Sequence, residues 1–171
     1  MTSPSRRVLI AGGGPAGLLA GMAAARAGAR VTIFEKNNTL GRKLAISGGG
    51  RANLTNVGDH RHIADAFGRD GRFLYSALNR FDNDSLVRLL SEIGVQVKVE
   101  DHGRIFPVTD SAKSVVDAME RALLSLGVEI RMNSAVAGLV MAAKAEGAGE
   151  LPVVKGLRIG SETVMGDAVI V

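Results

Sequence analysis

A glycine-rich turn and a carboxylate downstream of it are the groups in this sequence that could bind a phosphate-containing ligand. Gly12, Gly14 and Gly17 occupy the glycine positions of the pattern G-x-G-x-x-G. The first glycine of that pattern allows a tight turn, the second lets a pyrophosphate approach the backbone, and the third lets a helix pack closely on a strand. Glu35 lies 18 residues after Gly17, where a carboxylate can accept both hydroxyls of an adenosine ribose. This spacing predicts a dinucleotide site.

The residues around this turn predict a strand, a helix and a second strand in one βαβ unit. Val8 to Ala11 is a continuous apolar run, as expected for a parallel strand covered on both faces. Pro15 suits the first turn of a helix, whose N–H groups and positive dipole end would face the phosphates. Gly28 ends this helix, and Arg30 to Phe34 forms the next strand. The residues of this unit that we assign to the ligand are Gly12, Gly13, Gly14, Pro15, Ala16, Gly17, Glu35 and Lys36.

A second glycine cluster follows in a segment, residues 36–56, that is too rich in Gly, Asn and Arg to predict a regular core element. Gly48 to Gly50 lies among the cationic side chains of Arg42, Lys43 and Arg51. Such backbone can form an anion-binding nest beside cations. A segment of this length is functional or a flexible, solvated surface loop. The residue types alone leave both interpretations open.

The composition of the 171-residue chain indicates one α/β domain with an aliphatic core. It is 46% hydrophobic with 22 glycines, one Tyr and no Trp. The absence of cysteine excludes disulfides and thiolate metal sites. The net charge of +4 is spread without basic runs, so we expect no nucleic-acid partner. Arg26 and the consecutive glycines argue against a membrane span, and we interpret residues 1–7 as a short tail of a cytoplasmic protein.

The remaining elements follow from hydrophobic periodicity and from turn residues. Helices are predicted within residues 57–80, from Asp82 to Gly94 and from Ser111 to Leu126. Val95 to Phe106 predicts a β-hairpin that turns at residues 101–103. The strands predicted after the last helix are Val128 to Met132, then a meander of Asn133 to Met141, Val153 to Ile159 and Glu162 to Met165 with a polar break at residues 142–150, and finally Ala168 to Val171.

These elements predict an α/β fold of the Rossmann-like, FAD/NAD(P)-binding kind. Its parallel sheet has the strand order Val128, Val31, Val8, Ala168, named by the residues at which the strands start. We expect helices on one face of the sheet and the β-meander crossover on the other. The hairpin belongs to an inserted part of a small second lobe at about residues 57–110. We expect residues 1–171 to be one FAD/NAD(P)-binding domain that is incomplete.

Three sequence segments carry a resemblance to a known family. GGGPAG in the first turn, GRKLAISGGGRANLTN at 41–56 and DHGRIFPVTDSAKSVVDA at 101–118 resemble the bacterial NAD(P)/FAD-dependent oxidoreductases of the BaiN/RdsA type, which include aminoacetone oxidase-like flavoproteins. The resemblance implies that the chain is an N-terminal fragment and that the dinucleotide is FAD. One position departs from the family: Ala52 stands where the usual motif GGGRCN has cysteine, so any role of that thiol is lost.

The resemblance also implies roles for individual residues. Arg42 and Lys43 would lie by the cofactor phosphates, and Val136 would offer its backbone to the adenine. The residues implied at the ribityl and flavin end are Ser47, Gly48, Gly49, Arg51 and Asn53.

The function that we expect is the FAD-binding portion of a flavin-dependent oxidoreductase. It would transfer hydride or electrons between NAD(P)H and a small-molecule substrate that the sequence does not identify. The alternatives are an NAD-binding dehydrogenase domain, because Glu35 suits either dinucleotide, and a catalytically silent dinucleotide-binding fragment. The sequence assigns no catalytic residue and no oligomeric state.

The three histidines of the chain are candidate functional groups. His60 and His62 lie in a polar segment without a nearby acid cluster, so we expect solvated side chains and no metal. His102, with Arg104, lies near the predicted hairpin turn, where it could meet a substrate or serve only the turn. The second interpretation is favoured, because a hairpin turn alone supplies no partner that tunes a catalytic histidine.

Overall fold

The computed structural model describes residues 5–142 and 152–171, which form two compact units. The first unit contains the described residues up to Arg42 and from Glu120 onward, and the second is Lys43–Met119. The predicted polar break at 142–150, except residue 142, and the start of the predicted tail lie outside the described residues. The described helices include none with the length and apolarity that a membrane crossing requires.

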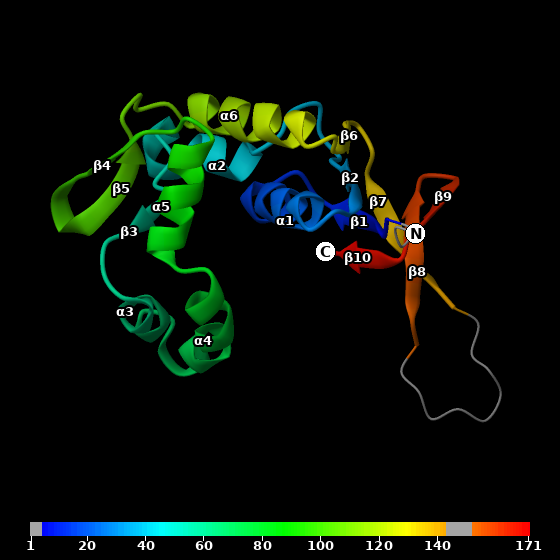
Figure 1. The fold of residues 1–171 in the computed structure, drawn as a ribbon, viewed down its shortest axis with the longest axis horizontal. Helices are drawn as coiled ribbons and strands as arrows, with labels where there is room; N and C mark the ends of the chain where they lie inside the picture. Colours follow the sequence, from blue (N-terminus) through cyan, green and yellow to red (C-terminus); the bar gives the residue numbers. More distant parts are fainter. Residues whose placement is uncertain (1–4, 143–151) are drawn as a thin grey trace. The chain divides into compact units, whose positions relative to one another are not determined.

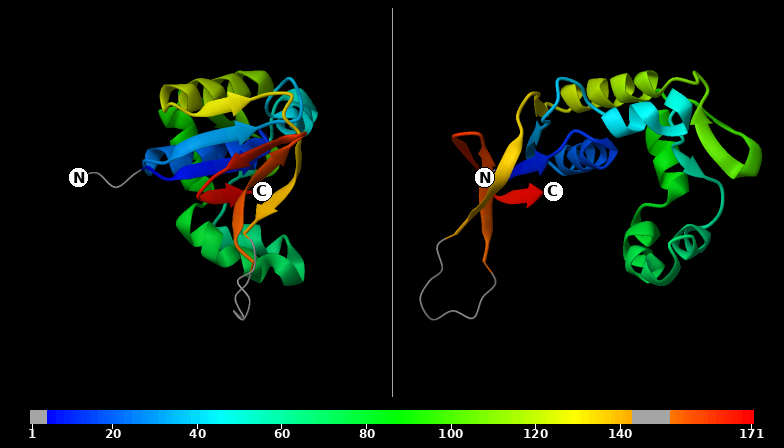
Figure 2. Two further views of the ribbon diagram at one scale, coloured as in Figure 1. Left: turned by 90° about the vertical axis from the view of Figure 1, so that its right-hand side faces the viewer. Right: turned by 180° about the vertical axis from the view of Figure 1, so that it is seen from behind.

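The first unit is built on a sheet of four parallel strands (Figures 1 and 2). The strand order is β10-β1-β2-β6, and this confirms the order predicted from the sequence. The register pairs Ile10 with Ile33 and Ile33 with Ile130, so apolar side chains line up across the sheet. The strands are β1 (Arg7–Ala11), β2 (Arg30–Phe34), β6 (Glu129–Arg131) and β10 (Ala168–Ile170).

Helices cover one face of this sheet, as predicted. Helix α1 (Pro15–Arg26) approaches it closely at Gly21, where an added Cβ atom would lie 2.9 Å from Ile33 Cδ1 and 3.1 Å from Leu123 Cδ2. Leu123 belongs to the last turns of α6 (Ala112–Ser125) and is fully buried. The small residue at Gly21 therefore lets α1 pack closely against both the sheet and α6.

The predicted β-meander covers the other face. Its antiparallel sheet has the order β7-β8-β9, and Leu157 and Val164 from this sheet form a buried cluster with Leu9 and Phe34 of the parallel sheet. Because Leu9 and Ile10 point to opposite faces of β1, one strand contributes to both layers. The meander strands are β7 (Val136–Met141), β8 (Val154–Ile159) and β9 (Glu162–Met165).

The second unit combines short helices with a three-stranded antiparallel sheet of order β3-β5-β4. The predicted hairpin is confirmed, and β3 adds a third strand that the sequence did not indicate. Asp82 caps α5 by accepting the Ser85 N–H at 2.8 Å. The elements are α2 (Arg42–Ile46, which begins at the last residue of the first unit), η1 (Ser47–Gly50), β3 (Thr55–Asn56), α3 (His60–Asp65), η2 (Gly68–Asp70), α4 (Gly71–Arg80), α5 (Asn83–Glu92), β4 (Val97–Val99), η3 (Asp101–Gly103), β5 (Arg104–Pro107) and the start of α6.

The structure corrects two sequence predictions in this unit. The single helical face expected within 57–80 is divided between α3 and α4. Gly68 has φ +61°, and an added Cβ at Gly71 would lie 2.0 Å from the carbonyl oxygen of Ala64, so the chain turns at one glycine and packs closely at the other. The segment at 36–56, predicted to lack regular structure, contains α2, the 3-10 turn η1 and β3.

Candidate dinucleotide site

The three glycines of the first turn differ in their backbone surroundings. Gly12 has φ +108° and donates its N–H to the Phe34 carbonyl at 2.8 Å. A Cβ added at Gly17 would lie 2.0 Å from the Gly12 carbonyl oxygen. A Cβ added at Gly14 would meet no atom within 4 Å from the described residues other than its two chain neighbours. The turn therefore needs glycine at the first position for its conformation and at the third for close packing, whereas the second faces open space.

The open side of Gly14 lies at the start of α1. Gly14 is the N-cap of this helix and supplies no side-chain cap, and Pro15 is the first helical residue. The first turn, which includes Ala16, contains no acidic side chain. Helix N–H groups without a side-chain acceptor can bind an anion, and the helix dipole favours negative charge at this end. The turn is thus suited to a phosphate group.

Gly13 joins the turn to the segment that follows β2. An added Cβ at Gly13 would lie 2.4 Å from Leu40 Cδ2 and 3.1 Å from Glu35 Cβ. The Gly13 carbonyl accepts the N–H of Gly41 at 2.9 Å, and the Gly13 N–H donates to Glu35 Oε2 at 2.8 Å. Both backbone polar groups of Gly13 are therefore hydrogen-bonded, one to Gly41 and the other to Glu35.

Glu35 is buried at the carboxyl end of β2 and already has hydrogen-bond donors. Besides the Gly13 N–H on Oε2, its Oε1 accepts the Asn37 N–H at 2.8 Å and Asn37 Nδ2 at 2.5 Å. Burial alone would raise the pKa of Glu35, but these donors and the nearby charge of Lys36 lower it below its ordinary value. The group is therefore a carboxylate at neutral pH. The side chain of Lys36 is exposed.

Asn37 was missed by the sequence reasoning. Its side-chain oxygen accepts Arg42 Nη1 at 2.8 Å, while its amide nitrogen donates to Glu35. Arg42, which the resemblance implies at the cofactor phosphates, thus contacts the side chain that donates to Glu35. The sequence feature that could have indicated this role is the amide of Asn37 two residues after Glu35, because an Asn side chain can donate and accept hydrogen bonds at once.

The second glycine cluster lies in the second unit and adopts left-handed backbone. Gly48, Gly49 and Gly50 have φ of +56°, +67° and +87°, and Ala52 has φ +64° although it is fully buried. A Cβ added at Gly48 would lie 2.7 Å from Phe106 Cε1, so this position requires glycine for two reasons. The segment therefore forms a turn of defined conformation that packs against Phe106.

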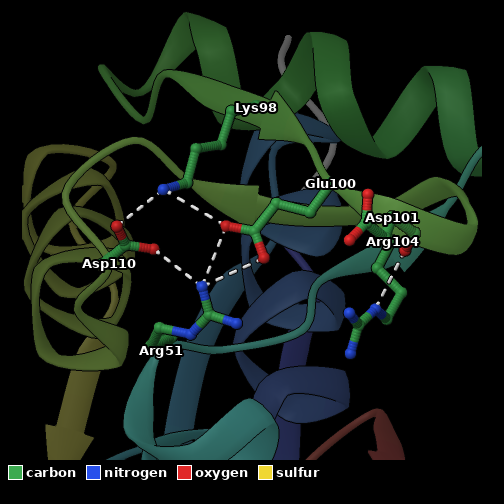
Figure 3. Close-up of polar contacts among 6 residues, drawn as sticks. All are labelled: Arg51, Lys98, Glu100, Asp101, Arg104 and Asp110. Carbon is green, nitrogen blue, oxygen red and sulfur yellow. Dashed lines mark hydrogen bonds and ion pairs between the residues drawn. The ribbon is translucent and has the colours of Figure 1, made fainter.

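Arg51 fixes this turn to the sheet of the second unit (Figure 3). Its guanidinium carbon lies 4.1 Å from the centroid of the buried Phe106 ring, and Nη1 donates to both oxygens of Glu100 and to Asp110. Lys98 Nζ bridges the same two carboxylates. The hydrogen bond from Arg51 lowers the pKa of Glu100, and the hydrogen bond from Lys98 lowers that of Asp110. These contacts hold the guanidinium within its own unit.

The residues assigned from the sequence are divided between the two units. Those from Gly12 to Arg42, together with Val136 at the start of β7, belong to the first unit. Lys43 and Asn53 are exposed in the second unit, and the Ser47 hydroxyl donates to the Leu44 carbonyl at 2.9 Å. The roles of Lys43, Ser47, Gly48, Gly49, Arg51 and Asn53 toward a flavin stay predictions.

His60 and His62 lie in the first turn of α3, and His102 lies in the hairpin turn. His62 donates its backbone N–H to Asp59 at the start of α3. Within residues 5–142 and 152–171, no three His, Cys, Asp or Glu side chains are grouped as metal ligands. His102 has φ +62° in the hairpin turn, and Arg104 Nε donates to the Asp101 carbonyl at 3.1 Å (Figure 3).

The chain is similar to one protein family and to several named relatives. Residues 6–165 match the model described as the HI0933-like protein Rossmann domain. The chain is 33% identical over 140 residues to a 3-dehydro-bile acid delta(4,6)-reductase of Clostridium scindens, covering 81% of this chain and 34% of that protein. It is 30% identical over 136 residues to a ribosomal RNA dihydrouridine synthase of Haemophilus influenzae, covering 80% and 33% respectively. The chain thus spans about a third of the curated relatives that it matches.

Solved structures show the same fold. A 3-ketosteroid-delta4-(5alpha)-dehydrogenase of Rhodococcus jostii superimposes with a TM-score of 0.65 at 18% identity, over 99% of this chain and 45% of that one. THI4 of Thermovibrio ammonificans gives a TM-score of 0.62 at 20% identity, over 96% of this chain and 56% of that one. At these identities the likeness concerns the fold.

Proposed function

The chain belongs to the HI0933-like family of Rossmann-domain proteins, and from this premise we propose that it is the FAD-binding portion of a flavin-dependent oxidoreductase. The observation that carries the proposal is the open position at Gly14 between two constrained glycines. A turn that only closed a helix onto a sheet would not require open space beside its second glycine. A diphosphate can use that approach to reach the helix N–H groups.

The residues of the first unit would bind the adenosine end of the cofactor. The turn from Gly12 to Gly17 would hold the diphosphate, Glu35 would accept a ribose hydroxyl, and the backbone of Val136 would meet the adenine. FAD supplies hydride and electron chemistry when it is bound. The contribution of this chain is to orient the cofactor, and we assign none of its side chains to a catalytic step.

The donor and the substrate are part of the proposal. We assign NAD(P)H as the electron donor and a small molecule as the substrate. The curated relatives are named as a 3-dehydro-bile acid delta(4,6)-reductase and a ribosomal RNA dihydrouridine synthase. The first name denotes a reduction, and this supports transfer of hydride to the substrate. We also propose a cytoplasmic location, where NAD(P)H is available as the donor.

Parallel titrations of the chain with FAD and with NAD test the choice of cofactor. The proposal expects saturable binding of one FAD per chain and weaker binding of NAD. NAD binding tighter than FAD binding would favour the dehydrogenase alternative. Binding of neither dinucleotide by the folded chain would contradict the proposal.

A further inference from the structure

The carboxylate of Glu35 has fewer acceptor positions left than a free carboxylate. Two carboxylate oxygens offer about four lone-pair positions. The Asn37 N–H and Asn37 Nδ2 both donate to Oε1, at 2.8 and 2.5 Å, and the Gly13 N–H donates to Oε2 at 2.8 Å. Oε1 is therefore saturated, and Oε2 retains one position. A ribose that presents two hydroxyls would find one acceptor on this side chain.

Arg42 determines which way the Asn37 amide faces. Arg42 Nη1 donates to Asn37 Oδ1 at 2.8 Å, and a guanidinium has no acceptor. The amide oxygen must therefore face Arg42 and the amide nitrogen must face Glu35. A flipped amide would set its oxygen against the carboxylate and its NH₂ group against the guanidinium, so both contacts would become repulsive. Arg42 thus fixes the orientation in which the Asn37 amide donates to Glu35 Oε1.

We propose that Asn37, held by Arg42, is a positioning residue that restricts Glu35 to one ribose hydroxyl. This inference rests on the proposed function, because it concerns how the same site recognises adenosine. The sequence pattern predicts a carboxylate that accepts both hydroxyls. The hydrogen bonds of Asn37 occupy the oxygen that would accept the second one, so the two hydroxyls are recognised unequally.

Calorimetric titration of the wild-type chain with ADP, 2′-deoxy-ADP and 3′-deoxy-ADP tests the inference. A hydrogen bond to a charged group corresponds to about a tenfold or greater change in affinity. We expect such a loss for one deoxy nucleotide and a loss of less than about threefold for the other. Equal losses for both would overturn the inference and leave the dinucleotide site intact. Absence of ADP binding would overturn the inference and the proposed site together.

Substitutions at Asn37 give a readout that a merely structural role would not change. Asn37→Ala removes the side-chain donor and frees one position on Oε1, so we expect this variant to lose about tenfold in affinity with either deoxy nucleotide. Asn38→Ala is the matched control, because Asn38 is exposed, and it should keep the unequal wild-type pattern. Arg42→Ala leaves the contact to Glu35 in place but releases the amide, and it should move the pattern toward equal losses. An Asn37→Ala variant that keeps the wild-type pattern would refute the role of Asn37.

Discussion

The glycines of the first turn can be separated experimentally into one that serves binding and one that serves folding. Gly14→Ala adds a methyl group that meets no atom within 4 Å in the described part of the chain, apart from its two sequence neighbours. Alanine is a poorer N-cap than glycine, at a cost of about 1 kcal/mol or less. The same methyl group occupies the approach of the diphosphate to the helix N-terminus. We therefore expect nearly wild-type stability and a loss of FAD affinity of about tenfold to 100-fold, as for a lost hydrogen bond to a charged group.

Gly17→Ala should have the opposite effect on stability. Its Cβ would lie 2.0 Å from the Gly12 carbonyl oxygen, so one of the two backbones must move by at least 1.0 Å to reach the 3.0 Å below which such contacts essentially do not occur. Overpacking costs about 1–3 kcal/mol or more, and alanine in place of helical glycine regains at most about 1 kcal/mol. We expect a net loss of about 2 kcal/mol in the free energy of unfolding.

Urea denaturation without ligand measures the stability of both variants, and fluorescence titration with FAD measures binding by the folded fraction. The two glycines are only three positions apart, so each variant is the control for the other. The account of the turn would be refuted if Gly14→Ala destabilised the chain as much as Gly17→Ala. It would equally be refuted if folded Gly14→Ala bound FAD like the wild type.

The second unit yields further predictions. Gly48→Ala places a side chain at φ +56° and 2.7 Å from Phe106 Cε1, and urea denaturation should show a loss of about 2–4 kcal/mol; unchanged stability would contradict the turn geometry. Arg51→Ala removes the partner that lowers the pKa of Glu100 and, with Lys98, that of Asp110. Carboxylates with lowered pKa stabilise the fold above their ordinary values of 4.5 and 3.8 and lose this contribution as the pH falls. Thermal denaturation against pH should therefore show a flatter acid limb for Arg51→Ala than for the wild type, and an unchanged limb would refute the ion-pair account.

The parallel sheet and its two covering layers could be predicted because each rests on a local signal. Continuous apolar runs mark β1 and β10, and the fixed glycine spacing joins β1 to α1. The division of 57–80 into two helices could not be predicted in this way. Hydrophobic periodicity continues through the break, whereas the contact of Gly71 with the Ala64 carbonyl exists only in the folded chain.

The candidate site was predictable in its residue types and less so in its contacts. The roles of Gly12 and Gly17 follow from a pattern whose reasons are steric. The partners of Arg51 lie 49 and 59 positions along the chain, and no spacing rule links residues that a hairpin brings together. Asn37 could not be predicted for another reason, because its amide acts only through Glu35. Its role depends on which donors already bind that carboxylate, and the sequence does not show them.

Comparison of FAD with FMN tests the central claim most directly, because FMN carries the flavin and one phosphate but lacks the adenosine half. The claim is that the first unit binds the cofactor through its adenosine end. Calorimetry of the folded wild-type chain should show saturable binding of FAD, displacement of FAD by ADP, and little or no binding of FMN. Equal affinities for FAD and FMN, or no binding of FAD, would contradict the claim.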